Sequence, residues 1–246
     1  MMLKYKVVGI ILASALVLFI IQLFPFSLYV NSSSVDKGIE VLDTLAKRDQ
    51  QAIEQEIQRV RSQQKVVDLP SLANRFSSSL IMGDSLCEAF LDYNLLNPSN
   101  VIALRGKRAD NIDQEIQKAI GLTPQNIFLG YGMNDIEYWR GLPEQFIEHY
   151  KVQIDKLQKA LPNTKIYINS LIPSTPNAVR DIPVYKEYKN YNAALVKMCN
   201  EENITFIDNT KIVDFNKDEI YEMDGVHPKY AYYPIWLAHM ASVAKL

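Results

Sequence analysis

Residues 79–86 read Ser79-Leu80-Ile81-Met82-Gly83-Asp84-Ser85-Leu86. A short apolar run ends in glycine, and the next residues, which include Cys87, Ala89 and Phe90, have a helical pattern. This order predicts a strand, a tight turn and a helix. Ser85 would then stand at the carboxyl end of a strand, next to the free N–H groups of a helix amino terminus that can hold an oxyanion. The alternative is that Asp84 or Ser85 only caps the helix.

Further apolar runs alternate with helical segments along the rest of the chain. The predicted strands are residues 79–82, 100–104, 126–129, 165–171 and 204–207, and the predicted helices are residues 86–93, 109–120, 143–161, 186–202 and 230–244. Strands that alternate with helices indicate an α/β fold with a mostly parallel sheet covered on both faces. In such sheets the active site lies at the carboxyl ends of the strands.

The third apolar run leads into a glycine-rich segment with an asparagine. Residues 127–135 read Ile127-Phe128-Leu129-Gly130-Tyr131-Gly132-Met133-Asn134-Asp135. The amide of Asn134 can donate to a negatively charged acyl oxygen in the cleft beside Ser85, and losing one such donor costs about 100 to 1,000-fold in rate. Taken alone, the segment would be an ordinary turn before a helix.

A histidine and an aspartate stand just ahead of the last predicted helix, where residues 224–228 read Asp224-Gly225-Val226-His227-Pro228. Histidine is a base whose pKa lies near neutrality, and an acid three residues earlier can orient its ring. The two other histidines, His149 and His239, fall inside helical patterns, where a surface or packing role is expected.

Together the blocks G-D-S-L, G-x-N-D and D-x-x-H resemble the SGNH (GDSL) hydrolase family over residues 78–240. The resemblance implies a flavodoxin-like three-layer α/β sandwich with a mostly parallel sheet of about five strands. It also implies that Ser85 is the nucleophile of a catalytic triad with Asp224 and His227, and that Asn134 is an oxyanion donor.

The same resemblance implies that the backbone N–H groups of Ser85 and Gly106 complete the oxyanion hole, and that no metal or cofactor takes part. The surroundings of Gly106 depart from the small, threonine-containing turn usual in the family. Beside it, Arg105, Lys107 and Arg108 either attract an anionic polymer or lipid headgroup or are solvated surface charges.

Other segments near the motifs could contact a substrate. The proline-containing residues 172–183 are expected to form a long loop that shapes a substrate lip. Several aromatic residues follow the motif blocks and either line an acyl or sugar subsite or pack in the core: Tyr138, Trp139, Tyr230, Tyr232 and Tyr233.

The composition fits one sizeable domain with short accessory segments: the chain has 246 residues, of which 48% are hydrophobic. A net charge of −2 gives no broad attraction for nucleic acid, so we expect no nucleic-acid partner. Two cysteines, Cys87 and Cys199, are too few for a disulfide scaffold, and we expect both to be small buried residues.

The amino terminus contains an uncharged apolar run over residues 7–24, preceded by Lys4 and Lys6. A run of this length predicts a transmembrane helix, with a cleaved signal peptide as the alternative, and the lysines favour a cytoplasmic amino terminus. The sequence thus predicts an anchor at 1–30, a helical stalk or linker at 31–75 and an SGNH catalytic domain at 76–246. The protein would be a single-pass membrane protein with its catalytic domain on the extracytoplasmic side.

Three functions fit this organisation. With water as acyl acceptor the protein is an esterase acting on an acetylated glycan or a lipid. With a sugar hydroxyl as acceptor it is an O-acyltransferase of the cell envelope, served by a membrane acyltransferase partner. A noncatalytic envelope scaffold with an SGNH shell is the third possibility, although the intact motif set argues against it.

Overall fold

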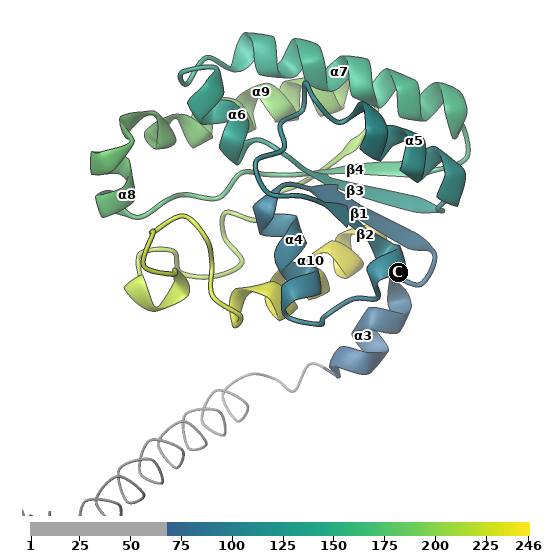
Figure 1. Cartoon of the computed structure of the whole chain (residues 1–246), viewed down its shortest axis with the longest axis horizontal. Helices are drawn as coiled ribbons and strands as arrows, with labels where there is room; N and C mark the ends of the chain where they lie inside the picture. Colours follow the sequence, from purple (N-terminus) through teal and green to yellow (C-terminus); the bar gives the residue numbers. More distant parts are fainter. Residues whose placement is uncertain (1–67) are drawn as a thin grey trace, which may run out of the picture. The chain divides into compact units, whose positions relative to one another are not determined.

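The computed structural model describes residues 68–246, and its centre is one sheet of five parallel strands in the order β2-β1-β3-β4-β5 (Figure 1). The strands are β1 Ser79–Gly83, β2 Val101–Ala103, β3 Asn126–Gly130, β4 Lys165–Asn169 and β5 Thr205–Ile207. The five predicted strands and the parallel α/β sheet are confirmed. The chain passes from β1 to β2 on one side and returns to β3 on the other, so the strand order reverses at β1.

Helices cover both faces of the sheet, with α4 and α10 on one side and α5, α7 and α9 on the other (Figure 1). The α-helices are α3 Leu69–Arg75, α4 Ser85–Asp92, α5 Asp113–Leu122, α6 Met133–Tyr138, α7 Pro143–Ala160, α8 Pro176–Asp181, α9 Tyr188–Glu201 and α10 Tyr232–Ala244. The described part of the chain also contains the short 3-10 helices η1 Pro98–Asn100, η2 Pro183–Glu187 and η3 Asp218–Ile220. The predicted three-layer arrangement is confirmed.

Burial on both faces explains why the central strands are continuous apolar runs rather than alternating ones. Every residue of β1 is buried. On the neighbouring strands the rings of Phe128 and Tyr167 stack with centroids 4.8 Å apart. The ring of Phe76 packs against Phe128 from the segment that leads into β1. The core therefore holds the strands in a fixed register, and with them the carboxyl edge of the sheet.

Helix α3 packs against α10 near the carboxyl terminus. The Arg75 guanidinium donates to the carbonyl oxygen of Leu246, with distances of 2.9 Å from Nε and 2.6 Å from Nη2. The compact unit that contains the sheet spans Val67–Leu246. Helix α3, which lies at the end of the segment predicted as a stalk or linker, belongs to this unit.

The segment 172–183, expected to be a long loop, contains helix α8. Thr175 caps this helix by accepting a hydrogen bond from the backbone N–H of Ala178 at 3.3 Å, and Pro176 occupies the first turn, where its missing N–H costs nothing. The backbone N–H of Thr175 also donates to the carbonyl oxygen of Gly225 at 2.8 Å. The segment supports the turn before His227.

Within residues 68–246, no helix combines the length and the apolar character needed to cross a membrane. The anchor predicted at residues 1–30, and all but the last part of the stalk predicted at 31–75, lie outside the described residues.

Candidate active site

Ser85 and Asn134 follow two neighbouring strands at one edge of the sheet. Ser85 is the first residue of α4, directly after β1, and Asn134 lies in the first turn of α6, just after β3. The last residues of the two strands, Gly83 and Gly130, are paired in register. Ser85 and Asn134 therefore come together because β1 and β3 are neighbours, as the strand-end rule for parallel sheets predicts.

The turn before Ser85 is close-packed because both strands end in glycine. A Cβ atom on Gly130 would lie 2.6 Å from Sγ of Cys87, which is far too close, and one on Gly83 would also collide with this side chain. The side chain of Asp84 caps α4 by accepting from the backbone N–H of Leu86 at 3.0 Å. Asp84 therefore caps the helix, so the hydroxyl of Ser85 at the helix start is not used as the cap.

Ser85, His227 and Asp224 form one hydrogen-bonded chain. Nε2 of His227 lies 2.8 Å from Oγ of Ser85, and Nδ1 of the same ring lies 2.6 Å from Oδ2 of Asp224. An ionised carboxylate can only accept, so Nδ1 carries the proton and donates to Asp224. Nε2 is then free to accept the proton of the serine hydroxyl, which is the arrangement of a nucleophile with its general base.

The turn around Asp224 orients its carboxylate. Its Oδ1 accepts hydrogen bonds from the backbone N–H groups of Val226 at 2.9 Å and His227 at 3.0 Å, and Gly225 between them has a φ of +69°. Burial raises the pKa of Asp224, but the hydrogen bonds from His227 and Val226 and the charge of His227 outweigh it, so the pKa lies below its ordinary value. Asp224 therefore stays ionised at neutral pH.

The predicted oxyanion donors lie around the same cavity as the triad. Ser85, Gly106 and Asn134 all line it, together with His227 and Asp224. In the part of the chain that the structure describes, the backbone N–H groups of Ser85 and Gly106 donate to no other protein group. The amide Nδ2 of Asn134 donates to the carbonyl oxygen of Lys107 at 3.1 Å. All five predicted site residues are thus brought together.

The cavity has a volume of about 620 Å³, within the range of small-molecule sites. Its remaining lining residues are Ala89, Asp92, Tyr93, Arg105, Glu222, Pro228 and Tyr233. Four of them, Ala89, Asp92, Tyr93 and Glu222, were not predicted as site residues. Ala89, Asp92 and Tyr93 stand four, seven and eight residues after Ser85. Residues at these spacings lie on one face of a helix, so their spacing was a sequence signal that they lie near Ser85.

The basic residues beside Gly106 are each paired within the protein. Arg105 contacts Glu88 at 2.9 Å and Asp92 at 2.8 Å. Lys107 and Arg108 likewise each pair with one acid at 3.0 Å, Glu115 and Asp110 respectively. Their charges are therefore balanced locally, which favours the surface-charge interpretation over attraction of an anionic polymer.

The other two histidines lie outside the catalytic cavity. The ring of His149 stacks on Trp139 with centroids 5.3 Å apart, and Nε2 of His239 lies 3.2 Å from the carbonyl oxygen of Asp208. His149 packs against an aromatic ring and His239 forms an exposed hydrogen bond, which fits the expected surface or packing role. Among residues 68–246 there is no group of three or more His, Cys, Asp or Glu side chains arranged to hold a metal ion.

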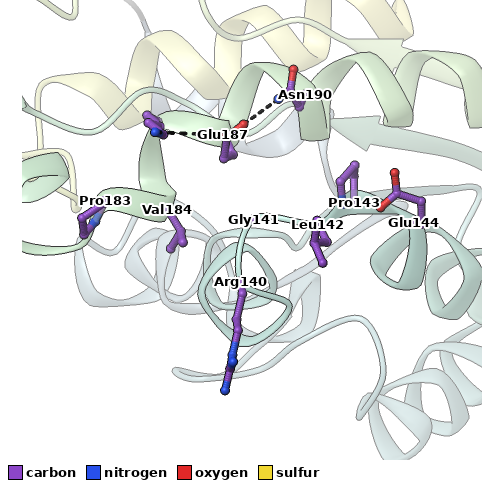
Figure 2. A pocket seen from close by; sticks show the side chains of 10 residues that line it. Arg140, Gly141, Leu142, Pro143, Glu144, Pro183, Val184, Glu187 and Asn190 are labelled. Carbon is purple, nitrogen blue, oxygen red and sulfur yellow. Dashed lines mark hydrogen bonds and ion pairs between the residues drawn. The ribbon is translucent and has the colours of Figure 1, made fainter.

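A second cavity of about 590 Å³ lies beside the turn between α6 and α7 (Figure 2). Figure 2 shows that the carboxylate of Glu187 is engaged by Asn190, while the side chain of Arg140 extends away from these residues. No serine, cysteine or histidine is among its lining residues within 68–246. Lys186, Glu144 and Glu187 line this cavity, but it lacks the pairing of a serine with a histidine that the cavity around Ser85 has.

Residues 71–234 match the sequence model of the GDSL-like Lipase/Acylhydrolase family, with the Ser85, Asn134 and His227 blocks inside the match. The chain belongs to this family. As a GDSL-type serine hydrolase it acts on ester bonds. No curated protein matches the chain.

Solved structures share the fold of this GDSL-type hydrolase at low sequence identity. A GDSL-like lipase from Bacteroides thetaiotaomicron is 16% identical, with a TM-score of 0.55 over 73% of this chain and 98% of the other. A carbohydrate esterase family 3 protein from Talaromyces cellulolyticus is 16% identical, with a TM-score of 0.53 over 68% and 95%. An acetylxylan esterase from Geobacillus stearothermophilus, crystallised as a catalytic mutant, is 15% identical, with a TM-score of 0.50 over 66% and 91%.

Proposed function

We propose that this GDSL-type hydrolase is a serine esterase that removes an acetyl or similarly short acyl group through a covalent acyl-enzyme. The observation that carries the proposal is the continuous hydrogen-bonded chain from Ser85 Oγ through His227 to Asp224, at 2.8 and 2.6 Å. A nucleophile, a base within hydrogen-bond reach and an acid that orients the base are the parts that acyl transfer requires.

In the first step, Oγ of Ser85 attacks the ester carbonyl carbon while Nε2 of His227 takes the hydroxyl proton. The N–H groups of Ser85 and Gly106 and the amide of Asn134 stabilise the oxyanion that forms. The carbon–oxygen bond to the alcohol then breaks, and His227 returns its proton to the departing alcohol. In the second step water attacks the acyl-enzyme with His227 again as base, which releases the acid and restores Ser85.

The lining of the cavity supports a short acyl group. Within residues 68–246, no leucine, isoleucine, valine, methionine or phenylalanine lines the cavity, and its apolar surface comes mainly from Ala89, Pro228 and the rings of Tyr93 and Tyr233. A long acyl chain would need a continuous apolar channel to leave water. Two of the structurally similar proteins are named as esterases of carbohydrates or of acetylxylan, which is consistent with this preference.

Water is the acceptor that we favour, because 39% of the His227 side chain is exposed and solvent can reach the base. The transferase alternative, in which a sugar hydroxyl accepts the acyl group and a membrane acyltransferase supplies it, uses the same triad. The connected triad argues against a noncatalytic scaffold.

We also propose that residues 7–24 anchor the protein, with the catalytic domain on the extracytoplasmic side of the membrane, since residues 4–6 carry the flanking lysines.

The decisive experiment is hydrolysis of 4-nitrophenyl acetate by the full chain in detergent. Ser85→Ala should reduce kcat to the background rate and leave the thermal unfolding curve unchanged, whereas the exposed-serine control Ser77→Ala should behave as wild type. Intact-mass spectrometry should detect an acetyl adduct on the wild type that Ser85→Ala lacks. If neither the wild type nor Ser85→Ala hydrolysed any short or long acyl ester, the esterase proposal would be contradicted.

Two further measurements separate the alternatives. Addition of a sugar acceptor should leave acetate as the main product; acetylated sugar as the main product would establish the transferase. Protease treatment of intact cells should remove a tag fused after Leu246, and protection of the tag would contradict the extracytoplasmic placement.

A further inference from the structure

The catalytic cavity is much larger than an acetyl group requires. An acetyl group has three heavy atoms, and at about 30 Å³ for each water-sized group it would occupy roughly 90 Å³. The cavity measures about 620 Å³. Most of its volume is therefore available to the alcohol part of the ester, and the side chains around that volume determine which alcohol fits.

An aromatic surface borders this space. Tyr93 follows the last turn of α4 and lines the cavity. Its ring packs against Tyr233, which is buried, and meets the ring of Tyr230 edge to face with centroids 5.3 Å apart. Tyr230 is 45% exposed, so it extends the aromatic surface from the cavity toward solvent. An exposed tyrosine ring offers a flat apolar face and a hydroxyl group that can form hydrogen bonds.

Hydrogen-bond acceptors lie next to these rings. Glu222 and Asp92 line the cavity, and burial together with the charges of Glu222 and Asp92 raises the pKa of the Tyr93 hydroxyl. Arg105 is held between Glu88 and Asp92. Apart from the triad, the charged lining residues within 68–246 are Asp92, Glu222 and Arg105, and the Arg105 guanidinium is already paired with Glu88 and Asp92.

We propose, on the basis of the esterase function above, that Tyr93, Tyr230 and Glu222 form a subsite for an uncharged pyranose ring, so that the substrate is a neutral O-acetylated carbohydrate. The apolar C–H face of a pyranose matches a tyrosine ring, and its hydroxyl groups can donate to carboxylates. An anionic sugar or a phospholipid headgroup would be repelled by Glu222, whereas Asp92 is already paired with Arg105.

The test compares two substrates on the full-length protein: a neutral acetylated xylo-oligosaccharide and 4-nitrophenyl acetate, which carries no sugar. The measured quantity is the ratio of kcat/KM for the sugar ester to kcat/KM for the aryl ester. Tyr230→Ala should lower this ratio about tenfold through the loss of aromatic contact. Glu222→Gln, which keeps the shape of the side chain, should lower it about fivefold through the loss of a charged acceptor.

Tyr138→Ala is the matched control, because Tyr138 is 54% exposed but does not line the catalytic cavity. Its ratio should equal that of the wild type. An acetylated uronic-acid oligosaccharide should be a poorer substrate than the neutral one, and Glu222→Gln should reduce that difference.

The outcomes separate the subsite from the enzyme activity. A wild type that hydrolyses neither substrate contradicts the proposed function itself. A wild type that hydrolyses both, with an unchanged ratio in Tyr230→Ala and in Glu222→Gln, overturns the subsite alone. Faster hydrolysis of a short-chain acyl phospholipid in vesicles than of the neutral sugar ester would also overturn it.

Discussion

The side-chain amide nitrogen of Asn134 lies 3.4 Å from Oδ2 of Asp84, a carboxyl group that is only 1% exposed. Asp84 comes from the turn after β1, whereas Asn134 comes from the turn after β3. Burial raises the pKa of Asp84 to about 7, although hydrogen bonds from backbone N–H groups and the charge of His227 lower it. A carboxyl group that both caps the helix of Ser85 and lies beside the amide of Asn134 can orient two parts of the proposed oxyanion hole.

Replacing the carboxyl group of Asp84 should disturb Asn134 more than the helix cap. In Asp84→Asn the new amide can still cap α4, because asparagine is a good cap, but its N–H₂ group would face the N–H₂ group of Asn134. We expect kcat on 4-nitrophenyl acetate to fall about tenfold or more, against about 100 to 1,000-fold for Asn134→Ala. If the double variant lost much more than Asn134→Ala, Asp84 would not act through Asn134.

The buried carboxyl group of Asp135 should make stability depend on pH. Burial raises its pKa from 3.8 to about 8, and its Oδ1 accepts from the backbone N–H of Ala109 at 3.0 Å. Because the folded state holds this proton more tightly than the unfolded state, unfolding releases it between about pH 4 and pH 8. The contribution of Asp135 to the free energy of unfolding is fully present below about pH 4. Between about pH 4 and pH 8 it falls by about 1.4 kcal/mol per pH unit.

Asp135→Asn cannot titrate, so its unfolding free energy relative to the wild type should rise as the pH increases from 5 to 8. Urea denaturation at several pH values measures this difference. Asp113→Asn is the control, because the hydrogen bond from Lys156 lowers the pKa of Asp113 and keeps it ionised throughout that range. If the unfolding free energies of wild type and Asp135→Asn changed in parallel with pH, Asp135 would be ionised in the folded protein.

The turn that presents His227 should not accept a side chain at Gly225. This glycine has a φ of +69°, and an added Cβ would collide with the side chain of Thr175 and lie 3.2 Å from Cβ of Ala178. Gly225→Ala should therefore lower both stability and kcat, with about 1–2 kcal/mol from the left-handed backbone alone. Gly121→Ala in α5, which meets nothing within 4 Å, should instead stabilise the protein by about 0.5–1 kcal/mol at unchanged kcat. Thermal unfolding and aryl acetate turnover compare the two.

Both thiols should be unreactive in the folded protein. Cys87 and Cys199 are free and buried, as expected from their number and surroundings. Burial raises the pKa of Cys199 to about 12, and burial with the charge of Asp84 raises that of Cys87 well above its usual value. Labelling with an aromatic disulfide reagent should proceed at the rate of unfolding. Rapid labelling of either residue in buffer, before any loss of structure, would contradict this assignment.

Local sequence patterns were sufficient to predict the elements that carry the chemistry. An apolar run, a glycine and a helical segment specify the turn at Ser85 through neighbouring residues alone. An apolar run and Gly130 likewise predict the turn before Asn134, although helix α6 was not predicted, whereas His227 was placed only by its motif ahead of the last helix. The basic residues near Gly106 show the limit of such patterns, because their charges are cancelled by partners such as Glu88 and Glu115 that the local sequence does not reveal. Helix α8 was missed because the prolines suggested a loop, whereas Pro176 occupies the first turn, where proline is tolerated.

The sequence by itself therefore determined the α/β class, the strand positions, the motif residues and their membership of one site. Only the tertiary structure decided which side chains surround that site. The Ser85–His227 hydrogen bond joins residues 142 positions apart, and Tyr93, Glu222 and Arg105 reach the same cavity from three separate segments. Local backbone conformation depends on adjacent residues, but the distance between two side chains depends on how whole strands and helices pack, which no short stretch of sequence contains.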